Sequence, residues 1–185
     1  MVNKSIHEES AAWWLNWNSM GCWQSHLQTY FQIFNGSLSH MNGPFLILED
    51  DIELSSHIFD LLSYDYLYHY LPDDWETFHL DHYDLKCFGN EVAWRRPTTS
   101  DKSHRQYCLV KHLVHLGGYV VRNARVAEKL LSLGNSDRWQ IADFYINGLF
   151  ERQEIRAYAP VKVAVRQQRN SFGTEIHFTK PGGFH

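Results

Sequence analysis

Apolar residues recur along much of the chain at spacings that distinguish helices from strands. From Met20 to Asn35-Gly36 they fall at i, i+4, i+7, i+8 and i+11, which predicts a helix with one buried stripe. The stripe consists of Trp23, Leu27, Tyr30, Phe31 and Phe34. The apolar run Phe45–Leu48, which follows Gly43-Pro44, predicts a short and fully buried strand.

The rest of the chain continues this alternation of strands and helices. We expect, in chain order, a helix capped by Ser55 or Ser56 and ending near Leu71, strands over 75–80 and 116–121, a helix capped by Asn123 and closed by Gly134, a helix from Ser136 or Asp137 to about Arg152, and a strand region over 155–165. The polar segment 86–111 reads as a long loop. The pattern predicts one α/β domain over 1–185, in which residues 1–19 remain unassigned.

Composition narrows the class of protein. Of the 185 residues, 44% are hydrophobic and 21% charged, which is ordinary for a globular domain. The net charge of -4 and the lack of a basic block argue against binding to a nucleic-acid backbone. No apolar signal core and no run of about 18 apolar residues occurs, so we expect no membrane span and a soluble, cytoplasmic chain.

The cysteines are Cys22, Cys87 and Cys108, odd in number, widely spaced and without a CxxC pair. This pattern supports neither a disulfide framework nor a zinc ribbon, and it favours a reducing compartment.

Three acids, Glu49, Asp50 and Asp51, stand directly behind Phe45–Leu48. Adjacent carboxylates repel one another and resist burial unless a cation lies among them. Mg²⁺ and Mn²⁺ take oxygen ligands and keep positions open for phosphates, and ligands of α/β sheets bind beyond the carboxyl ends of strands. The alternatives are a solvated acidic turn that caps the next helix at Ser55 and the acid site of a metal-dependent phosphohydrolase.

Two motifs together, GCWQSHLQTY over 21–30 and FLILEDDIEL over 45–54, resemble the paired signature of glycosyltransferase family 25. That family includes lipopolysaccharide and procollagen galactosyltransferases. Its helix with Gly-Cys-x-x-Ser-His, followed by an apolar strand ending in Glu-Asp-Asp, matches here at Gly21, Cys22, Ser25, His26, Glu49, Asp50 and Asp51. Looser similarity over 71–82, 115–131, 142–161 and 167–176 extends the resemblance from about Met20 to Ile176.

The resemblance implies a GT-A-like (Rossmann-like) mixed sheet flanked by helices. It also implies transfer of a hexose such as galactose from a nucleotide-sugar, a UDP-sugar, to a glycan or protein-linked acceptor, with Mn²⁺ or Mg²⁺ on the diphosphate. Glu49 and Asp51 become the expected metal ligands, and Asp50, Ser25 and His26 the expected contacts to the bound donor. Members of the family begin with a β-strand and an Arg-bearing loop that hold the nucleotide. Residues 1–19 contain no such segment, so we expect either a chain truncated at its N-terminus or a nucleotide half supplied differently.

The chemistry implied by the family needs a base for the acceptor hydroxyl. Asp143 is the first candidate, on a helix beside Trp139, Ile146 and Phe150, and Asp81 is the second. The alternative for Asp143 is an acid on the helix surface. A non-catalytic binding or assembly module derived from the family is the alternative for the whole chain.

His26 lies one helical turn beyond Cys22. Such a pair can bind a metal, but no further thiol is near in sequence, so we expect a polar contact or a buried core histidine rather than zinc. Gly117-Gly118 is expected to allow close backbone packing, the segment 95–105 to form a lid or a solvated loop, and Arg166 and Arg169 to reach phosphates.

Overall fold

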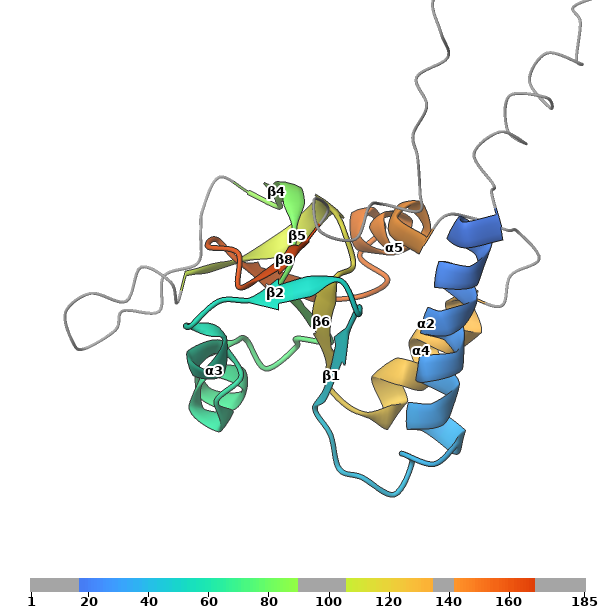
Figure 1. Cartoon of the computed structure of the whole chain (residues 1–185). Helices are drawn as coiled ribbons and strands as arrows, with labels where there is room; N and C mark the ends of the chain where they lie inside the picture. Colours follow the sequence, from blue (N-terminus) through green and yellow to red (C-terminus); the bar gives the residue numbers. More distant parts are fainter. Residues whose placement is uncertain (1–16, 90–105, 135–141, 169–185) are drawn as a thin grey trace, which may run out of the picture.

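The computed structural model describes residues 17–89, 106–134 and 142–168, and a mixed six-stranded sheet lies at its centre (Figure 1). The strand order is β1-β6-β3-β7-β5-β4. The strands are β1 (Phe45–Leu48), β3 (Thr77–His79), β4 (Tyr83–Cys87), β5 (Tyr107–Val114), β6 (Gly118–Val121) and β7 (Ala157–Pro160). Among the strands of the described residues, only β3 and β7 pair in parallel. A separate two-stranded sheet joins β2 (Ile52–Leu54) to β8 (Val165–Gln167). The predicted α/β class is confirmed.

Helices cover both faces of the sheet. One hydrophobic core lies under α2 (Trp17–Asn35), α4 (Ala124–Gly134) and α5 (Ala142–Glu151), and Figure 1 shows α2 and α4 side by side. The second core lies under α3 (Ile58–Leu61) and the π-helix η1 (Tyr66–Tyr70). Neighbouring residues of one strand enter opposite cores because side chains alternate along a strand. In β6, for example, Tyr119 and Val121 enter the first core and Val120 the second.

Several local predictions are confirmed. The helix predicted from Met20 is α2, and Asn123 caps α4 through a hydrogen bond from the Val126 N–H to its Oδ1 at 3.1 Å. The strand Phe45–Leu48 is β1, but its predicted full burial is wrong. Because β1 is the edge of the sheet, Leu46 and Leu48 are 41% and 39% exposed. Phe31 was also expected in the buried stripe of α2 and is 42% exposed.

The single helix predicted from Ser55 to about Leu71 is wrong. The segment forms α3 and η1 as two short pieces, and no side chain of the described residues caps α3. The Ser55 hydroxyl contacts His57 Nδ1 instead, at 2.9 Å. Between the pieces, the Ser63 hydroxyl donates to the Asp60 carbonyl and accepts from the Tyr66 N–H, so a side chain takes over backbone hydrogen bonds and ends the first helix.

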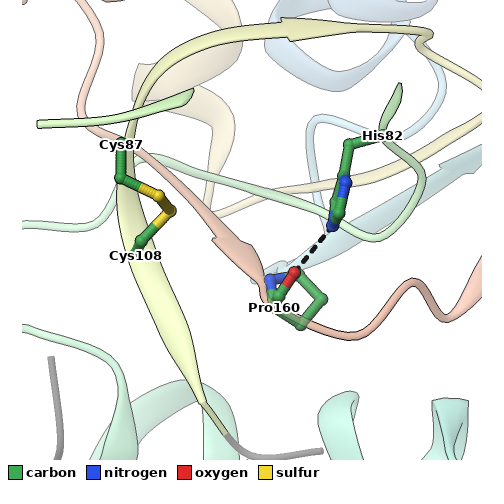
Figure 2. Close-up of a disulfide and its surroundings, with 4 residues drawn as sticks. All are labelled: His82, Cys87, Cys108 and Pro160. Carbon is green, nitrogen blue, oxygen red and sulfur yellow. Dashed lines mark hydrogen bonds between the residues drawn. A yellow bond between two sulfur atoms is a disulfide. The ribbon is translucent and has the colours of Figure 1, made fainter. Parts of the chain in front are cut away.

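The segment 86–111 is not one loop, because its ends lie in β4 and β5. A disulfide between Cys87 and Cys108 joins these two antiparallel strands (Figure 2). The expectation that the cysteine pattern supports no disulfide framework is therefore wrong, and the cysteines no longer favour a reducing compartment. Figure 2 also shows the hydrogen bond from the His82 ring to the Pro160 carbonyl, 2.7 Å, which ties the start of β4 to the end of β7. The predicted lid, 95–105, lies outside the described residues.

The C-terminal third differs from the prediction in two places. The helix expected from Ser136 or Asp137 is described from Ala142 onward, as α5, because 135–141 lie outside the described residues. The strand region expected over 155–165 divides into β7 and β8, which belong to different sheets. Within the ranges described, no helix combines the length and apolar character needed to cross a membrane.

Candidate functional site

The ends of two strands bring the first acids together. Both β1 and β3 run antiparallel to β6, so their carboxyl ends meet at the start of β6. Gly118 pairs with Leu48 on one side, and its carbonyl accepts the Leu80 N–H at 2.9 Å on the other. Glu49 and Asp81, which follow these two strands, therefore lie at the same edge of the sheet, where ligands of α/β sheets bind.

The three adjacent acids form the turn between β1 and β2. Glu49 and Asp51 are half-buried, and Asp50 is exposed. The backbone fixes the turn on both sides, because the Glu49 N–H donates to the Gly117 carbonyl at 2.9 Å and the Asp51 carbonyl accepts the Gln168 N–H at 2.6 Å. Asp51 Oδ1 is buried and has no hydrogen-bond partner within the described residues. The acids thus lead into a strand, and the alternative of a turn that caps a helix is wrong.

Glu49 faces two side chains of α2. Its Oε1 lies 3.8 Å from Cys22 Sγ and 3.8 Å from His26 Nε2. Its Oε2 accepts a hydrogen bond from the Gln167 amide at 3.4 Å. The possible ligand atoms of Cys22, His26 and Glu49 all lie within 4.8 Å of one another. The i, i+4 pair on α2 is visible in the sequence, whereas the carboxylate that completes the group comes from a different element.

A buried chain of hydroxyl groups holds the His26 ring. Its Nδ1 is hydrogen-bonded to the Tyr119 hydroxyl at 2.8 Å, and that hydroxyl is bonded to the Tyr30 hydroxyl at 2.7 Å. All three side chains are buried. His26 is therefore a buried, hydrogen-bonded histidine at Nδ1, as one of the alternatives expected. Its other ring nitrogen, Nε2, lies near Glu49.

The charges of several acids converge on Cys22. Burial, followed by the charges of Glu49 and Asp143 and a smaller effect of Asp51, raises the pKa of the Cys22 thiol to about 12. Cys22 is a free cysteine, and with this raised pKa it is a neutral thiol at pH 7. Asp143 therefore acts electrostatically on the same thiol as Glu49 and Asp51.

Asp143 occupies the first turn of α5 and is half-buried, not on an open helix surface. Its backbone carbonyl accepts a hydrogen bond from the Asn147 amide at 2.9 Å. The rings of Trp23 and Tyr145, with centroids 4.8 Å apart, hold α2 against α5. Trp139, one of the residues expected beside Asp143, lies outside the described residues.

Asp81 is more deeply placed, with only 3% of its surface exposed. Its Oδ2 lies 3.9 Å from His115 Nδ1. A Cβ on Gly117 would lie 2.5 Å from the same Oδ2, so a larger residue there would collide with the carboxylate. This confirms that Gly117 serves close packing. His115 has a φ of 85°, a conformation that is uncommon for a residue with a side chain.

Other predicted site residues lie elsewhere. Ser25 is exposed, and its hydroxyl donates to the Gly21 carbonyl of its own helix at 3.0 Å. Arg166 is exposed on β8, and Arg169 is outside the described residues. The structure therefore brings Glu49, Asp51 and Asp81 to the same edge of the sheet, with His26 and Cys22 beside Glu49. Asp143 is linked to this group through its charge on Cys22, and Ser25 and Asp50 lie at the surface.

A cleft of about 600 Å³ lies at the opposite end of the sheet, before β3 and after β6. Two of its charged pairs are close: Lys129 Nζ lies 2.7 Å from Glu76 Oε1, and Arg122 donates to the Trp75 carbonyl and lies over the Trp75 ring. This cleft contains none of the acids that follow β1.

The comparison with protein families bears on the whole arrangement. The model of the family described as glycosyltransferase family 25 (LPS biosynthesis protein) matches residues 1–145. The matched range contains both motifs, Asp81 and Asp143. It also contains residues 1–19, in which we recognised no counterpart of the family's nucleotide-binding strand and Arg-bearing loop. The comparison with curated proteins found no match. Since the matched range covers well over half of the sequence, the chain belongs to glycosyltransferase family 25.

Proposed function

We propose that this chain is a metal-dependent glycosyltransferase that moves a hexose such as galactose from a UDP-sugar to a glycan or protein-linked acceptor. One observation carries the proposal beyond family membership: Asp51 Oδ1 is buried without a hydrogen-bond partner in the described part of the chain, next to Glu49 at the carboxyl end of β1. A buried carboxylate oxygen without a partner is costly. A cation bound there would remove that cost.

The residues present fit a hard divalent ion. Glu49 and Asp51 offer carboxylate oxygens, the ligands that Mg²⁺ and Mn²⁺ prefer. Glu49 is oriented by its own N–H bond to the Gly117 carbonyl and by the Gln167 amide on Oε2. When bound, such an ion supplies Lewis-acid stabilisation of the negative charge on the leaving diphosphate. Asp50, which is exposed in the same turn, is assigned an outer contact to the donor.

The acceptor hydroxyl must lose its proton as its oxygen bonds to the sugar. We assign that proton to Asp143, because this carboxylate is half-buried and its charge reaches Cys22, next to Glu49. Asp81 is less suited to meet an acceptor, since it is 3% exposed and faces His115 and Gly117.

The test is calorimetric titration of UDP with Mn²⁺ or with EDTA, on wild type, Asp51→Asn and the control Glu53→Gln. Glu53 carries the same charge two residues further on but is exposed. We expect binding that requires Mn²⁺, is lost in Asp51→Asn and persists in Glu53→Gln. A wild-type protein that binds no UDP in either buffer would contradict the proposal and leave the non-catalytic module. Hydrolysis of a simple phosphate ester without UDP affinity would favour the phosphohydrolase.

A further inference from the structure

We propose that Cys22, His26 and Glu49 form a site for a thiophilic divalent cation, Zn²⁺ in the first place, which shares Glu49 with the Mn²⁺ or Mg²⁺ site of the proposed transferase. A thiolate, an imidazole and a carboxylate are a ligand set suited to Zn²⁺ and poorly suited to Mg²⁺. The proposal rests on the geometry of these three side chains and does not require glycosyl transfer.

Two of the three distances between ligand atoms are close to those around a bound zinc ion, and the third, between Cys22 Sγ and His26 Nε2, is within 4.8 Å. With metal–ligand bonds of about 2.0–2.3 Å in a tetrahedral arrangement, ligand atoms lie roughly 3.3–3.6 Å apart. Glu49 Oε1 is 3.8 Å from both Cys22 Sγ and His26 Nε2, so those pairs need to close by only a few tenths of an ångström. Three protein ligands leave a fourth position for water or another small ligand.

The groups behind the ligands are also in place. Histidine ligands of metals generally donate their second ring N–H to a partner that fixes ring orientation. In the tautomer that carries its proton on Nδ1, His26 donates to the Tyr119 hydroxyl, which can donate onward to Tyr30, and the free Nε2 lone pair lies on the side of Glu49. Gln167 holds the remote oxygen of the Glu49 carboxylate. Two of the three ligands thus carry an outer partner that orients them.

The local charge favours a dication. Glu49, Asp51 and Asp143 all act electrostatically on Cys22, and a divalent ion would offset their mutual repulsion. Binding is balanced as a proton exchange: the Cys22 S–H bond breaks, its electron pair forms the sulfur–zinc bond, and one proton leaves to solvent. No oxidation is involved. Because Glu49 serves both sites, zinc is expected to exclude Mn²⁺.

The experiment titrates Cd²⁺ and Zn²⁺ into the protein without nucleotide and without reductant, so that the Cys87–Cys108 disulfide stays closed. We expect one Cd²⁺ per chain with thiolate-to-metal charge-transfer absorption, displaced by Zn²⁺, and one proton released per ion. Cys22→Ser loses the absorption, whereas Gln24→Ala, an exposed neighbour on α2, keeps it. Tyr119→Phe retains the absorption but weakens binding roughly 10- to 100-fold, the usual effect of losing an outer partner.

A wild-type protein that shows no charge-transfer absorption at stoichiometric Cd²⁺ would overturn the proposal, whether or not Cys22→Ser folds. So would unchanged absorption in a folded Cys22→Ser. The outcome is separable from the proposed transferase function, because UDP is absent here and the UDP titration contains no zinc. Zinc binding without UDP binding would leave this site standing and remove the transferase proposal.

Discussion

The hydroxyl chain behind His26 gives a prediction that can be worked out from the structure. Tyr119→Phe removes one oxygen and no carbon, so it opens no cavity of consequence. It deprives two buried groups of their partner, the Tyr30 hydroxyl at 2.7 Å and His26 Nδ1 at 2.8 Å. Tyr30→Phe is the matched control, since it removes only the outer bond of the chain and leaves the bond between Tyr119 and His26 intact.

The magnitudes follow from what each variant leaves unsatisfied. Tyr30→Phe removes one hydrogen bond and should lower the free energy of unfolding by about 1 kcal/mol. Tyr119→Phe leaves two buried polar groups without a partner, at about 1–3 kcal/mol each, so we expect a loss of about 3 kcal/mol. For a chain of this size that is a fall of roughly 6–12 °C in Tm. In the double variant Tyr30→Phe/Tyr119→Phe, only His26 lacks its partner. Its free energy of unfolding should therefore be no lower than that of Tyr119→Phe.

Urea unfolding of wild type, the two single variants and the double variant, without reductant, measures these differences as a double-mutant cycle. The two single losses should sum to more than the loss of the double variant, because the hydroxyls act on each other. Equal losses for the two single variants, or strict additivity, would refute the idea that Tyr119 is the centre of the chain. A ¹⁵N spectrum of the His26 ring provides a second readout, since only Tyr119→Phe should change its tautomer.

Two further predictions concern stability. Burial, together with the nearby His82 and His26, lowers the pKa of His79 to about 3, well below the value near 6.5 of an unfolded chain. As the pH falls, the unfolded state therefore binds the proton first, and the free energy of unfolding should fall by up to about 1.4 kcal/mol per pH unit from about pH 6.5 toward pH 3. His79→Gln should flatten this slope in urea unfolding measured across that pH range. An unchanged slope would contradict the assignment to His79. The Cys87–Cys108 disulfide, with 21 residues of sequence separation, should contribute about 3 kcal/mol by restricting the unfolded chain. The Cys87→Ser/Cys108→Ser variant should therefore unfold at a lower urea concentration than wild type. Equal urea midpoints would argue that the two sulfur atoms are not bonded.

Local signals predicted a large part of the fold. The run Phe45–Leu48 became β1 with the acids at its end, and Asn123 caps α4, because a short apolar strand and an N-cap depend on neighbours in sequence. The helix expected over 55–71 failed because Ser63 competes for backbone hydrogen bonds, an effect that apolar spacing does not record.

Contacts between residues far apart in the sequence could not be predicted from it. Tyr119 lies 93 residues from His26 and Gln167 lies 118 residues from Glu49, yet each touches its partner. Nothing in the spacing of Cys87 and Cys108 shows that β4 and β5 bring them together. Glu49, Asp51 and Asp81 could be named in advance because they follow strands. The groups that orient them could not be named, because tertiary structure alone determines those contacts.

The central claim is that a metal–nucleotide complex binds at the carboxyl end of β1. The most direct measurement is paramagnetic broadening of amide NMR signals by substoichiometric Mn²⁺ in the presence of UDP, with Mg²⁺ as the diamagnetic reference. We predict selective loss of the signals of Glu49, Asp51, Gly117 and Asp143, while those around Arg122 and Lys129 in the distant cleft remain sharp. Broadening centred on that cleft, or none that depends on UDP, would contradict the account.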